Sequence, residues 1–346
     1  MIADVWTVTV GPDYWWVVVV KAAVLLLFLA TTAAYLVYAE RKIAAHIQLR
    51  IGPNRVGPFG LLQPAADAIK LLFKENVAPR GRDRILYLIA PGLAAGAAIA
   101  AFAAIPLSGV NDWFGYHFHW DIAHFNVGLL YILGVTSLGV YAIFLGGWSS
   151  NSKYSLLGAL RSSAQLISYE MAVAFALLGT VILAGSLDLE QIVQQQHHVW
   201  FVVLQPLAFV LYFVGGLAET NRLPFDLPEA ETELVAGYHT EYSGLRFGFY
   251  FLAEYINMVT VSSIATALFL GGYLPIIPQL DVIPGVFWFL AKAGALLFTM
   301  IWIRWTFPRL RYDRLMSVGW KVLLPLGLLN IAVTGAVVAI QAANGG

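Results

Sequence analysis

Carboxylates are concentrated between Glu219 and Gly244, where they could hold and exchange protons. This stretch contains a single base, Arg222, and six acids: Glu219, Asp226, Glu229, Glu231, Glu233 and Glu241. Glu229 and Glu233 stand one helical turn apart, a spacing at which like charges repel each other. Burial raises the pKa of a carboxyl group further, and coupled carboxyls titrate as a group. We therefore expect a shared proton population whose size responds to a nearby ligand that changes charge.

The apolar residues between these acids indicate where the stretch lies. Pro224, Phe225, Leu227 and Leu234 are interleaved with the carboxylates, so a loop facing water would also expose apolar surface. We expect the loop to fold back against neighbouring helices, with its carboxylates in a partly dry environment. A solvated acidic loop, the usual explanation of a charge run, is the alternative.

The composition is that of a polytopic membrane protein. Hydrophobic residues make up 60% of the chain and charged residues 12%, and the mean hydropathy is +0.74. Because cysteine is absent, the chain offers no thiolate to an iron–sulfur cluster and no disulfide. The seven histidines form no metal motif, and no dinucleotide fingerprint or P-loop occurs, so we expect no metal and no nucleotide site. The zero net charge argues against a nucleic-acid partner.

Eight apolar runs are long enough to cross the hydrocarbon core, which takes about 20 helical residues. They are 15–38, 85–107, 127–148, 163–184, 199–218, 247–270, 285–306 and 320–342. All lysines and arginines except Lys21 and Lys292 lie in or beside the connections after the odd-numbered runs. By the positive-inside rule those connections are cytoplasmic, and both termini lie on the outer side. We predict an all-α polytopic membrane protein with a single membrane domain over 1–346 and inner loops at 39–84 and 219–246.

The first inner loop is more patterned than a plain connector. Gly-Pro pairs between Arg50 and Pro58 each favour a defined turn, which would hold Arg50 and Arg55 in a protrusion suited to contact with another protein. Between Leu61 and Glu75 apolar residues cover one arc of a helical wheel, and lysines share the opposite arc. We predict an amphipathic helix in the membrane interface. Simple positive-inside bias with a lipid-surface helix is the alternative.

Three of the predicted spans carry a carboxylate in their inner half. Glu170 and Glu254 each lie about eight residues in from the inner face, and Glu219 closes its span at the inner edge. Acids at membrane depth are costly and mark ion or proton pathways. A single protonated glutamate bonded to a neighbouring helix would be a packing residue, but three acids that open toward the acidic loop favour a pathway.

Lys292 is the one base placed deep in a predicted span, nearer its outer half. It could belong to a proton relay, or its side chain could extend outward to the membrane surface. We leave it out of the predicted site for this reason.

Five blocks of sequence resemble a known family. They are 40–42, 50–75, 147–170, 218–244 and 304–321, and they cover all four inner loops and the adjoining helices. In them the chain resembles the quinone-chamber membrane subunit of proton-pumping NADH:quinone oxidoreductase, respiratory complex I. The resemblance implies a subunit that frames a quinone tunnel at the junction of the electron-transfer arm and the membrane arm.

The resemblance also implies roles for particular residues. A glutamate-lined path for coupling to proton translocation would use Glu170, Glu219, Asp226, Glu229, Glu231, Glu233 and Glu254. The quinone tunnel would use Arg41, Gln63, Phe225 and Arg304. Ubiquinone or another quinone would be the substrate, while FMN, the iron–sulfur clusters and NAD would be held by other chains.

The resemblance further implies partners and a location. Peripheral quinone-site and iron–sulfur subunits would bind on the cytoplasmic side, and small membrane subunits, antiporter-like subunits and lipid would surround the helices. We expect the bacterial plasma (inner) membrane, with the mitochondrial inner membrane as the alternative.

Two other functions stay open. A stand-alone secondary transporter would use the same acids for ion exchange, but it predicts internal repeats and helices broken at mid-membrane, and we find neither in the sequence. The homologous anchoring subunit of a membrane-bound hydrogenase complex would not need to bind a quinone.

Overall fold

The computed structural model describes residues 15–109, 111–113, 116–118, 125–226, 236–276 and 283–344. The long helices are α1 (Trp15–Ile47), α3 (Arg84–Phe102), α6 (Lys153–Ala184), α11 (Gly244–Phe269), α12 (Gly285–Thr306) and α14 (Leu324–Asn344). The shorter helices are α2 (Gln63–Phe73), α4 (Gly128–Thr136), α5 (Leu138–Ser149), α7 (Leu189–Gln195), α8 (Phe201–Leu204), α9 (Pro206–Glu219) and α13 (Tyr312–Val318). Two 3-10 turns (Pro58–Gly60 and Gly237–His239) and a π-helical turn (Gly319–Leu323) accompany them. The expected all-helical fold is correct apart from a small antiparallel hairpin, β1 (Asn111–Trp113) with β2 (Tyr116–Phe118).

Seven helical segments in the described part of the chain are long and apolar enough to cross a membrane, with α4–α5 and α13–α14 each acting as one segment. The remaining expected crossing, 199–218, is interrupted. α8 ends at Leu204, and α9 begins at Pro206 and is 14 residues long. Pro206 has no N–H to continue the ladder of α8, and Gln205 takes non-helical angles, φ −133° and ψ 58°. In the described part of the chain, seven segments of membrane-spanning length and one interrupted segment therefore stand where eight crossings were expected.

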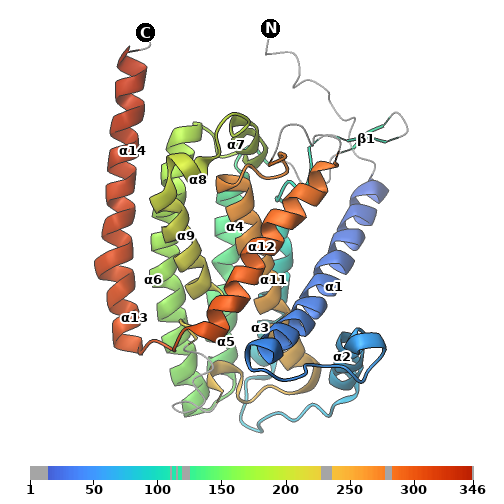
Figure 1. Cartoon of the computed structure of the whole chain (residues 1–346). Coiled ribbons are helices and arrows are strands. Elements are labelled where there is room, and N and C mark those ends of the chain that lie inside the picture. The colour runs from blue at the N-terminus through green and yellow to red at the C-terminus, as the bar shows by residue number, and fades with distance from the viewer. Residues whose placement is uncertain are drawn as a thin grey trace.

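The helix α11 runs through the middle of the bundle and is buried over most of its length (Figure 1). It packs against α1, α3 and α12, while α6 packs against α5, α9 and α14. Buried alanines on α3, such as Ala90, Ala94 and Ala98, allow the backbones of neighbouring helices to approach closely. By contrast, α1 and α14 lie at the outside of the bundle and expose apolar side chains such as Leu27 and Val333. These are the helices that lipid or partner subunits would cover.

The helix α2 marks one end of the bundle, which we call the α2 face; α1 begins and α14 ends at the opposite end (Figure 1). α1 continues past its expected end at residue 38 to Ile47. α2 covers most of the predicted 61–75 segment, and its Ile69, Leu72 and Phe73 are exposed, as an interfacial helix requires. The turns before α2 depend on glycine: Gly60 has φ +83°, and a Cβ there would lie 2.4 Å from the carbonyl oxygen of Pro53.

Lys292 is buried in α12. Its ammonium group donates to the carbonyls of Leu270, Gly272 and Leu274 at 2.7, 3.0 and 2.6 Å. These carbonyls follow the C-terminus of α11, where helical carbonyls lack intrahelical partners. Lys292 therefore caps α11, and its Nζ also lies 4.5 Å from the centre of the Trp200 ring.

We expect Lys292→Met to lower the free energy of unfolding by about 2 kcal/mol, because three carbonyls lose a charged donor. The measurement is thermal unfolding of the purified protein in detergent. Lys74→Met, which removes an exposed lysine just after α2, is the matched control and should leave the midpoint unchanged. Equal midpoints for the two variants would show that the cap contributes no stability.

Candidate functional site

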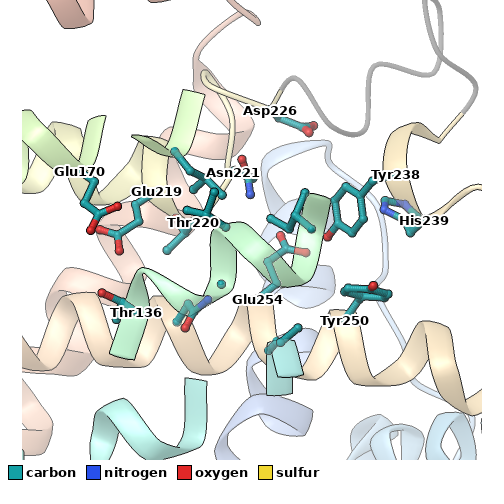
Figure 2. Close-up of a pocket in the computed structure, with 17 residues that line it drawn as sticks. Thr136, Glu170, Glu219, Thr220, Asn221, Asp226, Tyr238, His239, Tyr250 and Glu254 are labelled. Atoms are coloured by element: carbon teal, nitrogen blue, oxygen red, sulfur yellow. The ribbon is translucent and has the colours of Figure 1, made fainter. Parts of the chain in front are cut away.

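Acids from three separate segments line one cavity inside the bundle. Glu170 of α6, Glu219 at the end of α9, Asp226 beyond it and Glu254 of α11 all border this space (Figure 2). The cavity contains about 810 Å³ free of atoms, including its mouth. Polar residues of the wall are Thr136, Thr220, Asn221, Tyr238, His239, Tyr250 and Asn257. No group of three or more possible metal ligands occurs among the described residues.

Glu170 and Glu219 form a pair of acids in the cavity wall, with their carboxylates side by side (Figure 2). Ser137, at the break between α4 and α5, donates a hydrogen bond to Oε1 of Glu170. The hydroxyls of Thr136 and Ser137 also bond to the carbonyl of Leu133, and such local bonds compete with the helix ladder.

The segment from Thr220 to Asp226 folds back against the bundle, as expected for the start of the acidic loop. Gln165 of α6 donates to the carbonyls of Ala218 and Phe225 at 2.9 and 2.8 Å. Asp226 is buried and accepts a hydrogen bond from Arg309, with an Nη2–Oδ2 distance of 2.9 Å. The three remaining predicted acids, Glu229, Glu231 and Glu233, lie outside the described residues.

Beside the cavity lies a buried cluster of charges that the sequence analysis missed. Glu40 of α1 accepts hydrogen bonds from Arg222 at 3.1 Å, from the Tyr255 hydroxyl at 2.8 Å and from Arg304. The Nε of Arg222 also lies 2.7 Å from Oε1 of Glu254, in an ion pair. One guanidinium, only 2% exposed, therefore joins the end of α1 to the cavity wall.

The surroundings of Arg222 keep it charged. Burial lowers the pKa of its guanidinium, but the negative charges of Glu254 and Glu40 outweigh that effect and leave the pKa above its ordinary value. The Tyr255 ring, 4.3 Å from the guanidinium carbon, adds a cation–π contact. The sequence held a signal for this cluster: Arg222 is the one base of the acidic stretch, and Glu40 is the first charged residue after the first apolar run.

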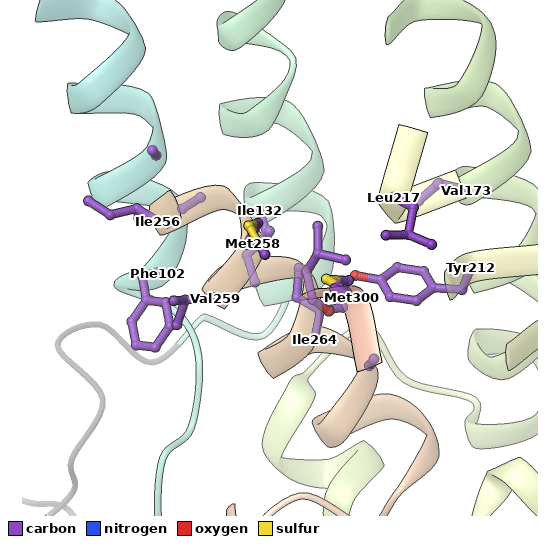
Figure 3. Packing of buried hydrophobic residues seen from close by; sticks show 14 of the residues in the cluster. Phe102, Ile132, Val173, Tyr212, Leu217, Ile256, Met258, Val259, Ile264 and Met300 are labelled. Atoms are coloured by element: carbon purple, nitrogen blue, oxygen red, sulfur yellow. Dashed lines mark hydrogen bonds between the residues drawn. The ribbon is translucent and has the colours of Figure 1, made fainter. Parts of the chain in front are cut away.

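A second, more apolar cavity of about 340 Å³ continues from Glu219 along α11. It shares Thr136, Glu219 and Asn257 with the first cavity. The rest of its wall is formed by Ile132, Leu133, Val173, Leu177, Tyr212, Thr260, Val261 and Ile264, several of which Figure 3 shows arriving from different helices. The Tyr212 hydroxyl donates to the carbonyl of Val261 at 3.1 Å. Glu219 thus stands where the two cavities meet.

The four residues expected for a quinone tunnel fall into separate places. Arg41 and Gln63 both bond to Asp67 of α2, at 2.7 and 3.0 Å. Arg304 contacts Glu40, and Phe225 is buried against Tyr169 with ring centroids 5.4 Å apart. None of the four borders either described cavity. Their role in a tunnel stays a prediction.

His239 borders the first cavity as a neutral side chain. Its ring packs against Tyr238 and Phe247, with centroid distances of 4.9 and 5.4 Å. Burial disfavours the imidazolium form and lowers the pKa of His239 from 6.5 to about 4.

We expect the protein to lose stability as the pH falls below about 6.5, because of His239. Between pH 6.5 and 4 the unfolded state binds more protons than the folded state, so the free energy of unfolding decreases with decreasing pH. The expected loss between pH 7.5 and 5.5 is about 1 kcal/mol. Thermal unfolding of native protein and His239→Gln across this range tests the expectation. A variant with the native slope would show that another group causes the dependence.

The comparisons with known proteins agree with these features. A family model described as NADH dehydrogenase matches residues 20–335. The chain belongs to the NADH dehydrogenase family. This match confirms the resemblance seen in the five sequence blocks. The long apolar helices make this NADH dehydrogenase family member a multi-pass membrane protein.

Relatives of this family member are named as components of an oxidoreductase. It is 54% identical over 311 residues to H subunit 1 of the NADH-quinone oxidoreductase of Geobacter metallireducens, a match that covers 90% of this chain and 93% of that protein. It is 52% identical over 314 residues to the H subunit of the NADH-quinone oxidoreductase of Thermomicrobium roseum, covering 88% and 91%. The corresponding protein of Rickettsia bellii is 52% identical over 310 residues, covering 88% of each chain.

Proposed function

We propose that the chain is the quinone-chamber membrane subunit, the H subunit, of a bacterial proton-pumping NADH:quinone oxidoreductase, respiratory complex I. In this proposal the acid-lined cavity couples quinone reduction to proton translocation, and the chain has no complete activity alone. The observation that carries the proposal is that Glu170, Glu219, Asp226 and Glu254 share one cavity within an apolar bundle. The names of the relatives support NADH and quinone as the substrates of the whole complex.

The proposal includes an orientation in the membrane. The α2 face lies in the cytoplasm, with eight crossings and both termini in the periplasm. The distribution of lysine and arginine supports this orientation, as does the placement of the start of α1 and the end of α14 opposite α2 (Figure 1). Peripheral quinone-site and iron–sulfur subunits bind the α2 face, and small membrane and antiporter-like subunits cover the exposed helices. FMN, NAD and the clusters reside in those partners.

The coupling begins at the substrate. Ubiquinone or another quinone enters a tunnel near Arg41, Gln63, Phe225 and Arg304, and a doubly reduced head group carries negative charge until it takes up protons. Arg304 shares Glu40 with Arg222, and Arg222 holds Glu254, so a negative charge near Arg304 changes the balance of attraction on Arg222. Glu254 then gains or loses a proton within the cavity.

A change in the protonation of Glu254 then affects the other acids of the cavity and of the loop. Glu219 and Glu170 border the same cavity as Glu254, so a proton gained or lost at Glu254 changes the electrostatic field that acts on both of them. Glu229, Glu231 and Glu233 of the acidic loop belong to the same group in this proposal. The second cavity, which begins at Glu219, gives the change a direction toward the membrane interior and the neighbouring subunits.

The experiment compares Glu219→Gln with native complex in membranes, by three measurements made side by side. These are NADH oxidation by an artificial acceptor, NADH:quinone turnover and proton uptake. We expect acceptor activity to stay native, and turnover and proton uptake to fall together by about ten-fold or more, because a proton-transfer group is lost.

The control is Glu75→Gln, which removes an exposed carboxylate near α2 and should leave all three activities native. Native activities for Glu219→Gln as well would overturn the proposal. Proton movement that continues without quinone turnover would instead favour the transporter alternative.

A further inference from the structure

Four hydroxyl groups gather at the end of α5 and have no role in the function proposed so far. They belong to Ser149, Ser150, Tyr242 and Tyr250, all of which are buried. The rings of Tyr242 and Tyr250 pack edge to face with centroids 5.1 Å apart, and both hydroxyl oxygens lie beside Gly146. The Tyr242 oxygen also lies 3.3 Å from the Ser149 Oγ. The four hydroxyls therefore cluster around Gly146.

Gly146 makes room for this cluster. A Cβ at Gly146 would lie 2.3 Å from the Tyr250 oxygen and 3.7 Å from the Tyr242 oxygen. The carbonyl of Gly146 accepts hydrogen bonds from Ser149 and Ser150, at 3.1 and 2.8 Å. Any larger residue at this position would displace the hydroxyls.

The hydroxyl cluster meets the acid-lined cavity at Tyr250. Tyr250 stands one helical turn before Glu254 on α11, and both side chains border the cavity (Figure 2). Tyr238, whose ring lies 5.2 Å from that of Tyr250, borders it as well. Water in the cavity can bridge Tyr250 to Glu254, since the wall there is polar and the space exceeds the size of several water molecules.

The other side of the cluster lies at the α2 face. Ser149 is the last residue of α5, Ser150 follows it, and the next residue, Asn151, is exposed. The carbonyl of Ser149 accepts a hydrogen bond from the backbone N–H of Asp83, which precedes α3 at the same end of the bundle. The hydroxyl cluster thus lies between the cavity wall and the α2 face of the protein.

We propose that Ser149, Ser150, Tyr242 and Tyr250 form a hydroxyl relay that carries protons between the α2 face and Glu254. This proposal rests on the function proposed above for the cavity acids. In each transfer a hydroxyl gives its proton to the next oxygen toward the cavity and takes one from the oxygen before it. One proton moves through the relay, and no electron changes place.

The chemistry of the tyrosines fits a relay. Burial raises the pKa of the Tyr242 hydroxyl, so this group keeps its proton until a neighbour accepts it. Its hydroxyl contacts Ser149 on the side of the α2 face, and its ring contacts Tyr250 on the side of the cavity. A purely structural role would also satisfy these buried hydroxyls, because Gly146 and Ala142 offer them carbonyl acceptors. Only a relay, however, makes turnover depend on proton transfer through Tyr242.

The test uses Tyr242→Phe and Gly146→Ala in membranes that contain the whole complex. We expect NADH:quinone turnover to fall at least about five-fold while artificial-acceptor activity stays native, since proton delivery is impaired. The ratio of turnover in H₂O to that in D₂O is expected to rise about two-fold over the native ratio. Added imidazole, a small proton carrier, should restore part of the turnover of Tyr242→Phe.

Tyr87→Phe is the matched control. The Tyr87 ring stacks on Tyr242 at 4.2 Å, but its hydroxyl donates to the carbonyl of Glu241 at 2.6 Å and stands outside the relay. This variant should keep native turnover and the native isotope ratio. A fall in Tyr242→Phe turnover without a change in the isotope ratio and without imidazole rescue would overturn the relay.

Glu254→Gln separates failure of the relay from failure of the proposed function. If Glu254→Gln loses quinone turnover while Tyr242→Phe keeps native turnover and isotope ratio, the relay is wrong and the cavity function stands. If both variants keep native turnover, both proposals are wrong.

Discussion

Replacing Arg222 with leucine is expected to lower the free energy of unfolding by about 3–5 kcal/mol, the cost of breaking a buried ion pair by removing one partner. Glu254 would lose the guanidinium that lies 2.7 Å away, and Glu40 would keep only Arg304 and the Tyr255 hydroxyl. The loop that carries Arg222 would also lose its connection to α1. We therefore expect little assembled complex in Arg222→Leu membranes, and no coupled quinone turnover from what remains.

The measurement is the thermal unfolding midpoint of the purified complex, together with the yield of assembled complex from membranes. Arg222→Lys is the matched control, since it keeps the charge but offers no planar fork that can contact two carboxylates in different directions. The unfolding midpoint and the yield of Arg222→Lys should lie between those of the native protein and those of Arg222→Leu. A native midpoint and yield for Arg222→Leu would show that the cluster contributes nothing to stability.

A double-mutant cycle with Glu40→Gln isolates the interaction energy between Arg222 and Glu40. Because Arg222 and Glu40 are in contact, the effects of the two single substitutions should not add, with a coupling of about 1–3 kcal/mol. Additive effects would place the cost of Arg222→Leu in its contact with Glu254 alone.

Local patterns predicted much of the fold. Length and hydropathy placed the spans, and the arc of apolar residues over 61–75 placed α2, because both signals depend on neighbours within a few turns of helix. They also placed Glu170, Glu219 and Glu254 in the inner half of their spans, and these three acids line one cavity. The helix break at Gln205 could have been predicted from Pro206, but the hydropathy of the run 199–218 does not reveal it.

Contacts between distant segments were beyond such patterns. Arg222 and Glu40 are 182 residues apart, and the fold of the whole bundle decides that they meet. Lys292 shows the same limit, because its acceptors are carbonyls at the end of another helix, and backbone carbonyls leave no mark in a sequence. Gln165 likewise fixes the start of the acidic loop through two carbonyls. The sequence could show which residues were out of place in a membrane, but not what each of them binds.

Gly158 packs directly against the backbone of the turn Gly237–His239. Gly158 lies in the first turns of α6, where a Cβ would stand 2.7 Å from the Cα of Gly237 and 2.9 Å from its carbonyl carbon. Both atoms belong to backbone and cannot rotate away, so Gly158→Ala must push the turn Gly237–His239 off α6. We expect Gly158→Ala to lower the free energy of unfolding by about 3 kcal/mol, in the upper part of the usual range for overpacking. Thermal unfolding of the purified complex measures it.

Gly294→Ala in α12 is the matched control, because a Cβ there meets nothing within 4 Å. The same substitution should then be neutral or stabilise the helix by about 0.5–1 kcal/mol, as alanine does in a helix interior. Displacement of the turn at Gly158→Ala would also expose His239, which should recover an ordinary pKa and remove its part of the pH dependence of stability. If Gly158→Ala unfolds at the native midpoint and keeps that pH dependence, α6 does not hold the Tyr238–His239 wall of the cavity in place.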